Sequence, residues 1–403
     1  MTVAALHRAP APAAPMARHA GPGCALALRQ LDLTDFRNYV ALRLELAPRP
    51  VVLTGPNGAG KTNLLEAVSY LGPGRGLRRA ALPAVARHGS AGGRWAVAAR
   101  LVTPAGPVRL GTGIAEAPGR RRAIHVDGEA ARGQMALAEH VNVIWLTPEM
   151  DRLFQDGAAG RRRFLDRMVY GFDPEHASRV AAYEQAVRGR ARLLRDGVAD
   201  AAWLAAQEDV IADKGVAIAA ARRDAVARLA AAIAEDAEAA SALPFPRAGL
   251  ALDGEVEGWL GDGPALAAED RLRAALAASR RDDAASGTTA HGPHRSDLQV
   301  RHLGKDRPAD QCSTGEQKAL LIGIVLAHAR LQALARGAPP VLLLDEVAAH
   351  LDADRRAALY DRLVQLGAQA WLTGTDAALF EAIAPNAQFF AVDNATVSPA
   401  GAA

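Results

Sequence analysis

Cysteine and aromatic residues are scarce in this sequence. Only two cysteines, Cys24 and Cys312, occur among its 403 residues, and aromatic residues make up 4%. Two cysteines are too few for a disulfide framework or a cysteine-rich metal site, so the default expectation is a reducing, cytoplasmic compartment. Hydrophobic residues make up 50% of the chain, and with so few aromatics the core must be mainly aliphatic.

Long apolar runs and a large net charge are also missing. No run approaches the length of a membrane-spanning helix, so we expect no membrane segment. Residues 1–24 lack the continuous apolar stretch of a signal peptide, and we interpret them as a disordered extension. The formal net charge is only +3. This balance permits nucleic-acid binding but requires any basic surface to be local.

The N-terminal part does contain a glycine-rich loop between an apolar run and a helical pattern. Residues 51–53 are predicted to form a buried strand, and residues 63–71 a helix. The loop between them fits the phosphate-loop pattern and consists of Gly55-Pro56-Asn57-Gly58-Ala59-Gly60-Lys61-Thr62. In such a loop, backbone N–H groups surround phosphate oxygens, the lysine reaches the β- and γ-phosphates and the threonine holds Mg²⁺. The alternative is a glycine-rich turn before a core helix, which the register of Lys61 and Thr62 disfavours.

Residues 25–150 show mainly strand patterns. Alternation of apolar and polar residues over 26–33 and 40–46 predicts a hairpin that leads into the phosphate-loop strand. An antiparallel meander and then a buried strand are predicted over residues 95–102, 108–114, 122–126 and 141–146.

From residue 151 the composition changes to alanine, leucine, arginine and glutamate with helical spacing. Helices are predicted over residues 151–169, 173–195, 199–240 and 264–282. Residues 283–290 are expected to be a polar linker. We therefore predict a helical domain over residues 151–285, without the sustained heptads of an extended coiled coil.

Strand and helix patterns of a nucleotide-binding domain return over residues 286–403. The predicted elements cover residues 298–302, 313–334, 341–344, 355–366, 370–373 and 389–392. Residues 25–150 and 286–403 are therefore expected to form one α/β domain, into which the helical domain is inserted.

Four aliphatic residues at 341–344 are followed by Asp345 and Glu346. A buried parallel strand would deliver this acidic pair to the carboxyl edge of the sheet, where ligands bind in such folds. Asp345 is predicted to hold the Mg²⁺ shell, and Glu346 to orient or deprotonate the attacking water. The alternative is an ordinary strand that ends at a helix cap.

Ser313-Thr314-Gly315-Glu316 precedes a long apolar helix. Ser313 and Glu316 have the spacing of a capping box, which is a sufficient structural explanation on its own. The functional alternative is that the Ser313 hydroxyl and the Gly315 N–H bind a phosphate from a helix N-terminus.

Together these motifs resemble the ATP-binding-cassette heads of the SMC family. The resemblance includes the phosphate loop, the Ser-x-Gly-Glu helix start and the aliphatic-Asp-Glu strand followed by Leu351-Asp352. Other segments are similar to the RecF family of bacterial recombination mediators. These segments are Thr34-Asp35-Phe36-Arg37-Asn38-Tyr39, Lys61-Thr62-Asn63-Leu64-Leu65-Glu66-Ala67, Pro148-Glu149 with Gly157 and Arg161-Arg162-Arg163-Phe164-Leu165-Asp166, and Gly292-Pro293-His294-Arg295-Ser296-Asp297-Leu298.

The resemblance implies a P-loop ATPase head of the ABC/SMC type with an inserted helical domain. Such heads form homodimers head to tail around two ATP molecules. Each Ser313–Glu316 segment would then meet the nucleotide of the other subunit. Lys61 and Glu346 would be catalytic, and Thr62, Asp345 and Glu149 would serve Mg²⁺. The implied nucleotide-binding positions are Gly55, Pro56, Asn57, Gly58, Ala59, Gly60, Lys61, Thr62, Asn63, Arg37, Asn38, Ser313 and Gly315.

Some positions depart from the pattern of related cassettes. Thr314 stands where transporter cassettes have glycine, and Ala349 where many relatives have serine. The switch-histidine position holds no histidine, and either Thr373 or Thr375 occupies it. A weakened switch predicts slow, DNA-dependent ATP hydrolysis, with the ATP state acting mainly as a clamp.

Three arginine clusters are the candidate DNA contacts. They consist of Arg75, Arg78 and Arg79, of Arg120-Arg121-Arg122, and of Arg161-Arg162-Arg163. Such residues give sequence-independent, salt-sensitive binding to the DNA backbone, although charge runs are more often solvated faces. Aromatic residues are not interleaved with them, which favours duplex or junction DNA over stacking on single strands.

By resemblance, the predicted function is ATP-dependent DNA binding in recombinational repair and replication-fork maintenance. The family acts in homologous recombination and the SOS response, and helps to load RecA on gapped DNA together with RecO and RecR. Two alternatives stay open from the residues. A transporter ATPase subunit is disfavoured by Glu316 and by the Phe36–Tyr39 segment. Another SMC-like chromosome-maintenance ATPase would need longer arms than the insert provides.

Overall fold

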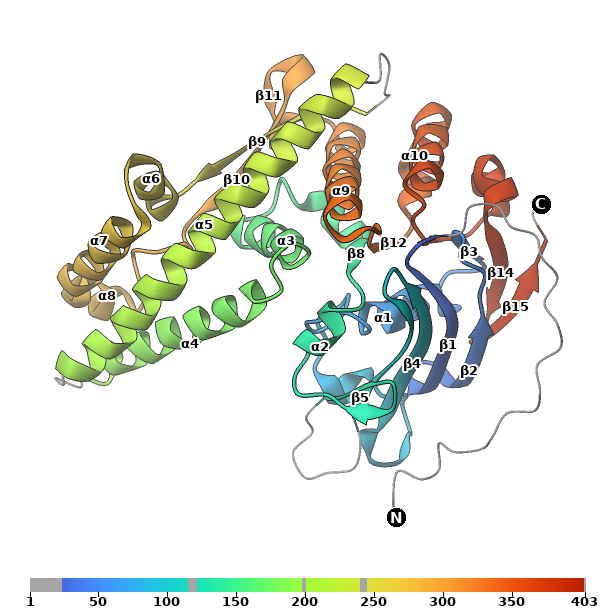
Figure 1. The fold of residues 1–403 in the computed structure, drawn as a ribbon, viewed down its shortest axis with the longest axis horizontal. Coiled ribbons are helices and arrows are strands. Elements are labelled where there is room, and N and C mark those ends of the chain that lie inside the picture. The colour runs from blue at the N-terminus through green and yellow to red at the C-terminus, as the bar shows by residue number, and fades with distance from the viewer. Residues whose placement is uncertain (1–23, 115–121, 198–200, 240–244, 402–403) are drawn as a thin grey trace.

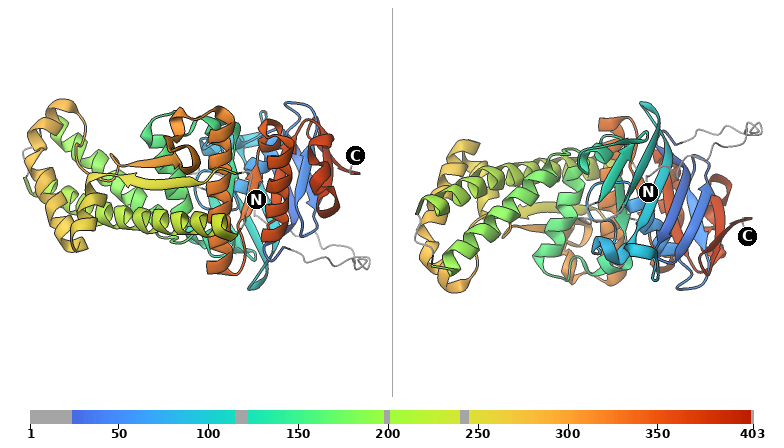
Figure 2. Two further views of the ribbon diagram at one scale, coloured as in Figure 1. Left: turned by 90° about the horizontal axis from the view of Figure 1, so that it is seen from above. Right: turned by 90° about the horizontal axis from the view of Figure 1, so that it is seen from below.

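A computed structural model describes residues 24–114, 122–197, 201–239 and 245–401. Apart from Cys24, the predicted extension over residues 1–24 lies outside them. Two parts are visible in Figure 1: a head that contains both large sheets, and an arm that runs from α3 to β10. Figure 2 shows the arm projecting from one side of the head in both further views.

The head is organised around a six-stranded, mostly parallel sheet with the order β15-β14-β3-β13-β12-β8. Only the pairing of β15 with β14 is antiparallel. The strands are β3 (Val51–Thr54), β8 (Val143–Leu146), β12 (Val341–Leu344), β13 (Ala370–Gly374), β14 (Gln388–Asp393) and β15 (Thr396–Ala400). The predicted strands of this sheet are confirmed, whereas β15 is an addition.

Successive residues of the central strands point into two different cores. Val51 and Leu53 pack toward the second sheet, whereas Val52 packs toward the helices on the opposite face. All three side chains are fully buried. Burial on both faces explains why these strands are continuous apolar runs and not alternating ones.

A six-stranded antiparallel sheet covers one face of the parallel sheet, in the order β2-β1-β4-β5-β6-β7. Its strands are β1 (Ala27–Phe36), β2 (Tyr39–Glu45), β4 (Trp95–Thr103), β5 (Gly106–Ile114), β6 (Ala123–Val126) and β7 (Glu129–Ala130). The helix α1 (Lys61–Ser69) shares a hydrophobic core with both sheets. The predicted hairpin and meander are therefore confirmed. The short helix α2 (Met135–Ala138) leads into β8.

Two long helices, α9 (Thr314–Arg336) and α10 (Ala353–Leu366), cover the other face of the parallel sheet (Figure 1). A 3₁₀ segment, η8 (Ala377–Asn386), packs beside α10. By length and composition α9 could cross a membrane, contrary to the prediction from the sequence, but 61% of its most apolar window is buried inside the fold. Its apolar character is explained by its place in the core.

The arm is a layered bundle around the 39-residue helix α5 (Ala201–Ala239). At 1.5 Å per residue α5 is about 58 Å long, and it reaches from the far end of the arm to the head (Figure 1). The other helices are α3 (Ala158–Tyr170), α4 (His176–Arg195), α6 (Glu255–Asp262), α7 (Ala265–Ala278) and α8 (Arg280–Ser286). A separate hydrophobic cluster joins α4, α5, α6 and α7.

Some arm elements differ from the prediction. The first helix starts at Ala158 and not at residue 151, because a 3₁₀ turn, η4 (Pro148–Arg152), precedes it. Residues 283–286 belong to α8 and not to a linker. A three-stranded sheet of β11 (Arg307–Pro308), β10 (Asp297–His302) and β9 (Ala248–Asp253) was not expected. β9 lies before the predicted domain boundary at residue 285, and its partner β10 lies after it. The boundary is therefore crossed by one sheet, and its position stays a prediction.

Candidate nucleotide site

The phosphate loop joins β3 to α1, at the carboxyl edge of the parallel sheet. Gly55 and Gly60 have φ angles of 148° and 120°, which residues with a side chain rarely adopt. A Cβ atom on Gly55 would lie 2.0 Å from the carbonyl oxygen of Val392. One on Gly60 would lie 2.6 Å from the hydroxyl of Tyr39. The loop thus requires glycine for both its backbone shape and its close neighbours.

The turn between β1 and β2 holds the phosphate loop from the side. The Asn38 amide donates to the carbonyl of Ala59 at 3.2 Å, and the Tyr39 hydroxyl donates to the carbonyl of Gly60 at 3.2 Å. The amide of Asn63, on α1, donates to Asn38 Oδ1 at 2.7 Å. Asn38 and Asn63 therefore lie next to the loop, and their contact with nucleotide stays a prediction. Tyr39 was not singled out as a site residue, although it belongs to the quoted Phe36–Tyr39 segment.

Arg37 is committed to the helix behind the loop. Its guanidinium donates to the buried carboxylate of Glu66 at 2.8 and 2.5 Å, and to the carbonyl of Ala84 at 2.7 Å. Arg78 adds a 2.9 Å ion pair to the same carboxylate. The hydrogen bond with Glu66 raises the pKa of Arg37. Arg37 therefore braces α1 in this structure, and its contact with nucleotide stays a prediction.

Lys61 lies under the loop with its ammonium group directed at backbone oxygens. Lys61 Nζ donates to the carbonyls of Gly55 and Pro56 at 2.6 and 2.9 Å. Burial lowers the pKa of Lys61, while the charges of Glu346 and Asp345 raise it. The loop therefore holds a charge among backbone groups, at the place where the motif binds phosphate oxygens.

Asp345, at the end of β12, joins two threonine hydroxyls. Thr62 Oγ1 donates to Asp345 Oδ1 at 3.1 Å, and Thr373 Oγ1 donates to the same oxygen at 2.7 Å. Burial raises the pKa of the Asp345 carboxyl, and the two hydroxyl hydrogen bonds oppose that shift. Thr373 is buried against Asp345, whereas Thr375 is exposed just beyond β13.

The residues at Asp345 fit a magnesium ion. Mg²⁺ prefers hard oxygen ligands and is usually held by one or two protein groups together with phosphate oxygens and water. Thr62 and Asp345 present a hydroxyl and a carboxylate oxygen 3.1 Å apart. Within the described ranges, no cluster of three or more His, Cys, Asp or Glu could hold a metal by itself. The donor set therefore matches an ion that arrives with a nucleotide.

Glu346 follows Asp345 in a left-handed backbone conformation, with φ 53° and ψ 21°. A glutamate in this region costs on the order of 1–3 kcal/mol and persists only where its surroundings impose it. The Glu346 N–H donates to Thr373 Oγ1 at 2.8 Å, which fixes the turn. The turn thus holds Glu346 in a strained conformation directly after the strand, and its catalytic role stays a prediction.

Glu149 lies one strand further along the same edge. β8 pairs in parallel with β12, and the N–H of Asp345 donates to the carbonyl of Leu146 at 2.9 Å. Glu149 follows on η4 and is exposed. The parallel pairing thus brings Glu149 to the same edge as the acidic pair, and its metal-sensing role stays a prediction.

Ser313 caps α9 in a full capping box. Ser313 Oγ accepts from the Glu316 N–H at 3.4 Å, and Glu316 accepts from the Ser313 N–H at 3.1 Å. An ion pair with Lys305 lowers the pKa of Glu316 to about 2. Among the described residues, no hydrogen bond or ion pair connects Ser313 or Gly315 to the phosphate loop. The two predicted halves of the site are therefore separate within one chain.

The arginine clusters divide into structural and free residues. Arg122 is half-buried and donates to the carbonyls of Tyr70, Gly72 and Gly74, and desolvation lowers its pKa to about 10. Arg122 is thus engaged inside the head, and its contact with DNA stays a prediction; Arg120 and Arg121 lie outside the described residues.

Arg161 is engaged as well, because it forms a two-bond ion pair with Asp297 at 2.7 and 2.8 Å. Arg78 is bound to Asn63 and Glu66 on α1. By contrast, Arg75, Arg79 and Arg163 are exposed and form no ion pair with another described residue. A charge run does not show in advance which of its guanidinium groups the fold will use.

This arrangement defines the class of protein. A phosphate loop on a parallel sheet, an antiparallel sheet over one face and an inserted helical arm are the features of an SMC-type head. A family model described as "RecF/RecN/SMC N terminal domain" matches residues 27–398.

The relatives narrow this class to one family. The chain is 54% identical to the DNA replication and repair protein RecF of Mesorhizobium japonicum, over 92% of this chain and 97% of that protein. It is 51% identical to the protein of the same name from Brucella suis, over 91% of this chain and 94% of that protein. The chain therefore belongs to the RecF family.

Solved structures agree with the fold. The structure described as the recombination mediator protein RecF-ATPrS in the RecFOR pathway aligns with a TM-score of 0.81 at 20% identity, over 94% of this chain and 99% of that one. An SMC head bound to the C-winged helix domain of ScpA aligns with a TM-score of 0.51 at 15% identity, over 93% and 96% of the two chains.

Proposed function

We propose that this chain is an ATP-dependent DNA-binding protein of recombinational repair and replication-fork maintenance. In this proposal, ATP joins two copies into a clamp on gapped duplex DNA, at the junction of single and double strands. The observation that carries it is the linkage of Lys61, Thr62 and Asp345 around one phosphate loop, with Ser313 on a separate element.

The chain's own residues account for ATP binding. The loop N–H groups and the N-terminus of α1 favour a bound anion. Lys61 supplies a point charge to the β- and γ-phosphates, and Thr62 and Asp345 hold a magnesium ion, which neutralises phosphate charge when bound. Glu346 orients the attacking water or accepts its proton. Because a threonine, either Thr373 or Thr375, stands where other cassettes have a switch histidine, hydrolysis is slow.

Dimerisation follows from the division of the site. Among the described residues, neither Ser313 nor Gly315 forms a hydrogen bond or ion pair with the loop of its own chain, so in this proposal they serve the γ-phosphate that is bound to the other copy. A phosphate at the N-terminus of α9 is favoured by unpaired N–H groups and by the helix dipole.

The partners in the proposal come from the relatives. Curated relatives are named for DNA replication and repair, and one solved RecF is described as part of the RecFOR pathway. By extension, we propose that this chain acts in the cytoplasm with RecO and RecR to assist the loading of RecA.

Sedimentation of the full chain with ATP or ADP, and with or without a gapped duplex, tests this function. The expected result is a dimer in ATP that binds the gapped DNA, and a monomer in ADP. A chain that stays monomeric in ATP and does not bind the DNA would contradict the proposal.

A further inference from the structure

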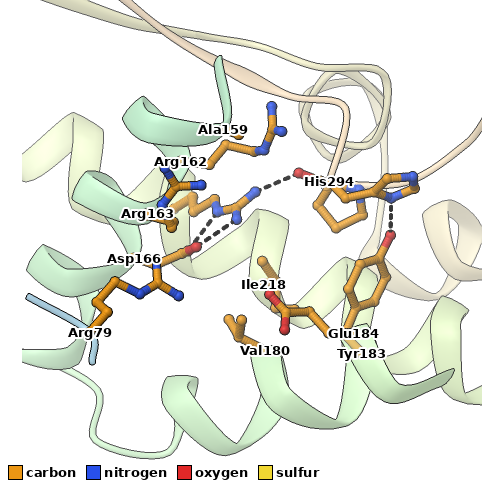
Figure 3. A pocket seen from close by; sticks show the side chains of 12 residues that line it. Arg79, Ala159, Arg162, Arg163, Asp166, Val180, Tyr183, Glu184, Ile218 and His294 are labelled. Carbon is orange, nitrogen blue, oxygen red and sulfur yellow. Dashed lines mark hydrogen bonds and ion pairs between the residues drawn. The ribbon is translucent and has the colours of Figure 1, made fainter. Parts of the chain in front are cut away.

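A basic cavity lies where the segment after α1 meets the arm. Its volume is about 240 Å³, and its walls come from Arg79, from one face of α3, from α4 and α5, and from the turn before β10 (Figure 3). The α3 face includes Arg162, Arg163 and Asp166. The cavity is therefore shared by two parts of the sequence that are about 80 residues apart, and it combines two of the three arginine clusters.

The acidic group at the base of the cavity is already neutralised. Asp166 accepts two hydrogen bonds from Arg222, at 2.8 and 2.9 Å, and one contact from His176 at 2.9 Å. Arg222 in turn donates to the carbonyl of Pro293 at 2.6 Å. Asp166 is labelled in Figure 3, where dashed lines mark its hydrogen bonds. Asp166 is thus not available to the other arginines.

The remaining cations face the cavity without a carboxylate partner. Arg162 donates only to the carbonyl of Ser296, at 2.6 Å, and Arg79 and Arg163 form no ion pair with another described residue. Burial, followed by the charge of Arg222, lowers the pKa of Arg162.

On the opposite wall Glu184 forms a 3.5 Å pair with Arg188, and burial lowers the pKa of His294. Counting the lining side chains, four guanidinium groups against two carboxylates leave an excess of two positive charges.

This chemistry suits a phosphate group. Guanidinium groups bind phosphate oxygens through two parallel N–H bonds, and such charge-assisted bonds are among the strongest in proteins. A volume of about 240 Å³ is smaller than the roughly 300–1,000 Å³ of sites for drug-sized ligands. The cavity therefore fits one phosphate with its water and not a whole nucleotide.

Arg79 is also placed by a special backbone conformation. Its φ angle is 54°, in the left-handed region that non-glycine residues rarely occupy. The preceding residue, Arg78, is bound to Asn63 and Glu66 of α1. Arg79 is therefore held at the end of a segment that is anchored on the phosphate-loop helix.

We propose that this cavity binds one phosphate of the DNA backbone, which Arg79 of the head and Arg162 and Arg163 of the arm share. The bound phosphate bridges the head segment to the arm. This inference rests on the proposed DNA-binding function. DNA is favoured as the source because Arg79 and Arg163 both line the cavity and are exposed, so a phosphate within a chain can reach them from outside.

Salt-dependent DNA binding tests the bridge with Arg79→Gln, Arg163→Gln and the double variant. Both side chains are exposed, so the substitutions do not disturb the fold. Fluorescence anisotropy of a labelled gapped duplex is measured with ATP over a range of salt concentrations. Arg281→Gln, at an exposed site on α8, is the matched control. Arg163→Lys keeps the charge but removes the planar fork.

If the two arginines share one phosphate, each single variant lowers the salt slope by about 0.9, which corresponds to about fivefold weaker binding at 0.15 M salt. The double variant is then little weaker than either single variant, because the phosphate is already lost. Arg163→Lys keeps most of the slope, and Arg281→Gln keeps all of it. Inorganic phosphate competes with DNA more strongly than chloride of equal ionic strength in the wild type only.

Other outcomes overturn the bridge. Losses that multiply in the double variant mean two separate phosphate contacts. Wild-type affinity and slope in all variants mean that the cavity holds no DNA. If inorganic phosphate binds the wild type but not the variants, and the variants bind DNA as the wild type does, the cavity holds a free anion instead. If the wild type binds no DNA at all, the proposed function is wrong. That case is recognised because neither the wild type nor any variant changes the anisotropy of the labelled duplex.

Discussion

Lys61 is the residue whose loss should affect nucleotide binding most directly. The residue is 5% exposed, and its ammonium group donates to two backbone carbonyls. Removing one partner of a desolvated charge pair costs about 2–5 kcal/mol. We expect Lys61→Ala to weaken ATP binding by an amount in that range in a fluorescent-nucleotide titration. Lys214→Ala, on the arm, is the control. Equal affinity of Lys61→Ala and wild type would refute the assignment.

A substitution of Glu346 should distinguish ATP hydrolysis from ATP binding. Glutamine has a similar shape and can keep the N–H contact to Thr373, but it is a poor base. We expect Glu346→Gln to bind ATP normally, to hydrolyse it far more slowly and to accumulate the dimer. Single-turnover hydrolysis and ATP titration measure the two steps separately. Hydrolysis at the wild-type rate would assign the role to another residue.

At the scale of the element, α9 and α3 are joined through a buried histidine. His328 is fully buried, and its Nε2–H donates to the carbonyl of Met168 at 2.8 Å. Burial is the largest cause of a pKa of about 4 for His328, and the charge of Arg167 lowers this pKa by a smaller amount. The hydrogen bond to the carbonyl of Met168 opposes the shift. The imidazole is therefore neutral in the folded protein at neutral pH.

This histidine predicts a loss of stability in mild acid. Because the folded pKa lies below the ordinary value of about 6.5, the unfolded chain binds more protons as the pH falls from 6.5 toward 4. Between pH 6.5 and 5.0 the free energy of unfolding should fall by about 2 kcal/mol. Because His294 also has a lowered pKa, some drop should remain in every variant, but it should be about this much larger in wild type and in the exposed control His88→Gln than in His328→Gln. A parallel drop in His328→Gln would exclude His328 as the cause.

The elements show what the sequence could and could not reveal. Strands β3 and β12 are continuous apolar runs, and their burial on two faces produces that pattern directly. Strand β9 has the sequence Ala-Gly-Leu-Ala-Leu-Asp, and its partner β10 follows more than 40 residues later, so neither composition nor neighbouring segments indicated it. The start of α9 could be predicted, because Ser313 and Glu316 have the spacing of a capping box and form one in the structure.

The same limit applies to the site. The phosphate loop and Asp345 could be predicted because backbone shape and metal chemistry restrict their residue types to short, ordered motifs. The fate of Arg122 could not, because its partners are carbonyl oxygens that only the folded chain brings together. Thr373 was left undecided for a similar reason, since its contact with Asp345 depends on the order β13-β12 in the sheet.

At the scale of the whole molecule, one core connects the head to the arm. Residues of α3, α5 and β10 share a hydrophobic cluster with the parallel sheet and α9. Arg330 on α9 adds ion pairs to Asp236 and Glu235 near the C-terminal end of α5, at 2.6 and 2.9 Å. The head is therefore packed and ion-paired against the base of an arm about 58 Å long.

The proposed clamp requires Ser313, which lies at the start of α9 and forms no hydrogen bond or ion pair with its own phosphate loop within the described part of the chain. ADP lacks the γ-phosphate, so only ATP should favour the closed dimer, in proportion to its differential affinity for the two states. We expect Ser313→Arg to abolish ATP-dependent dimers, because it places a bulky cation at the contact. ATP binding by the monomer should persist, since Lys61 and Thr62 belong to the other half of the site. Ala267→Arg, which adds the same charge on exposed α7, is the control.

Light scattering in ATP and in ADP distinguishes the possible roles of Ser313. A wild type of equal mass in both nucleotides would refute the clamp. A Ser313→Arg variant that still dimerises on ATP would refute the role of Ser313 and leave the clamp intact. Because Ser313 also caps α9, a loss of its capping bonds to Glu316 could itself unfold the helix start. Ser313→Asp keeps the cap but repels the γ-phosphate, so it should fold normally and fail to dimerise, which separates the contact across the interface from the cap.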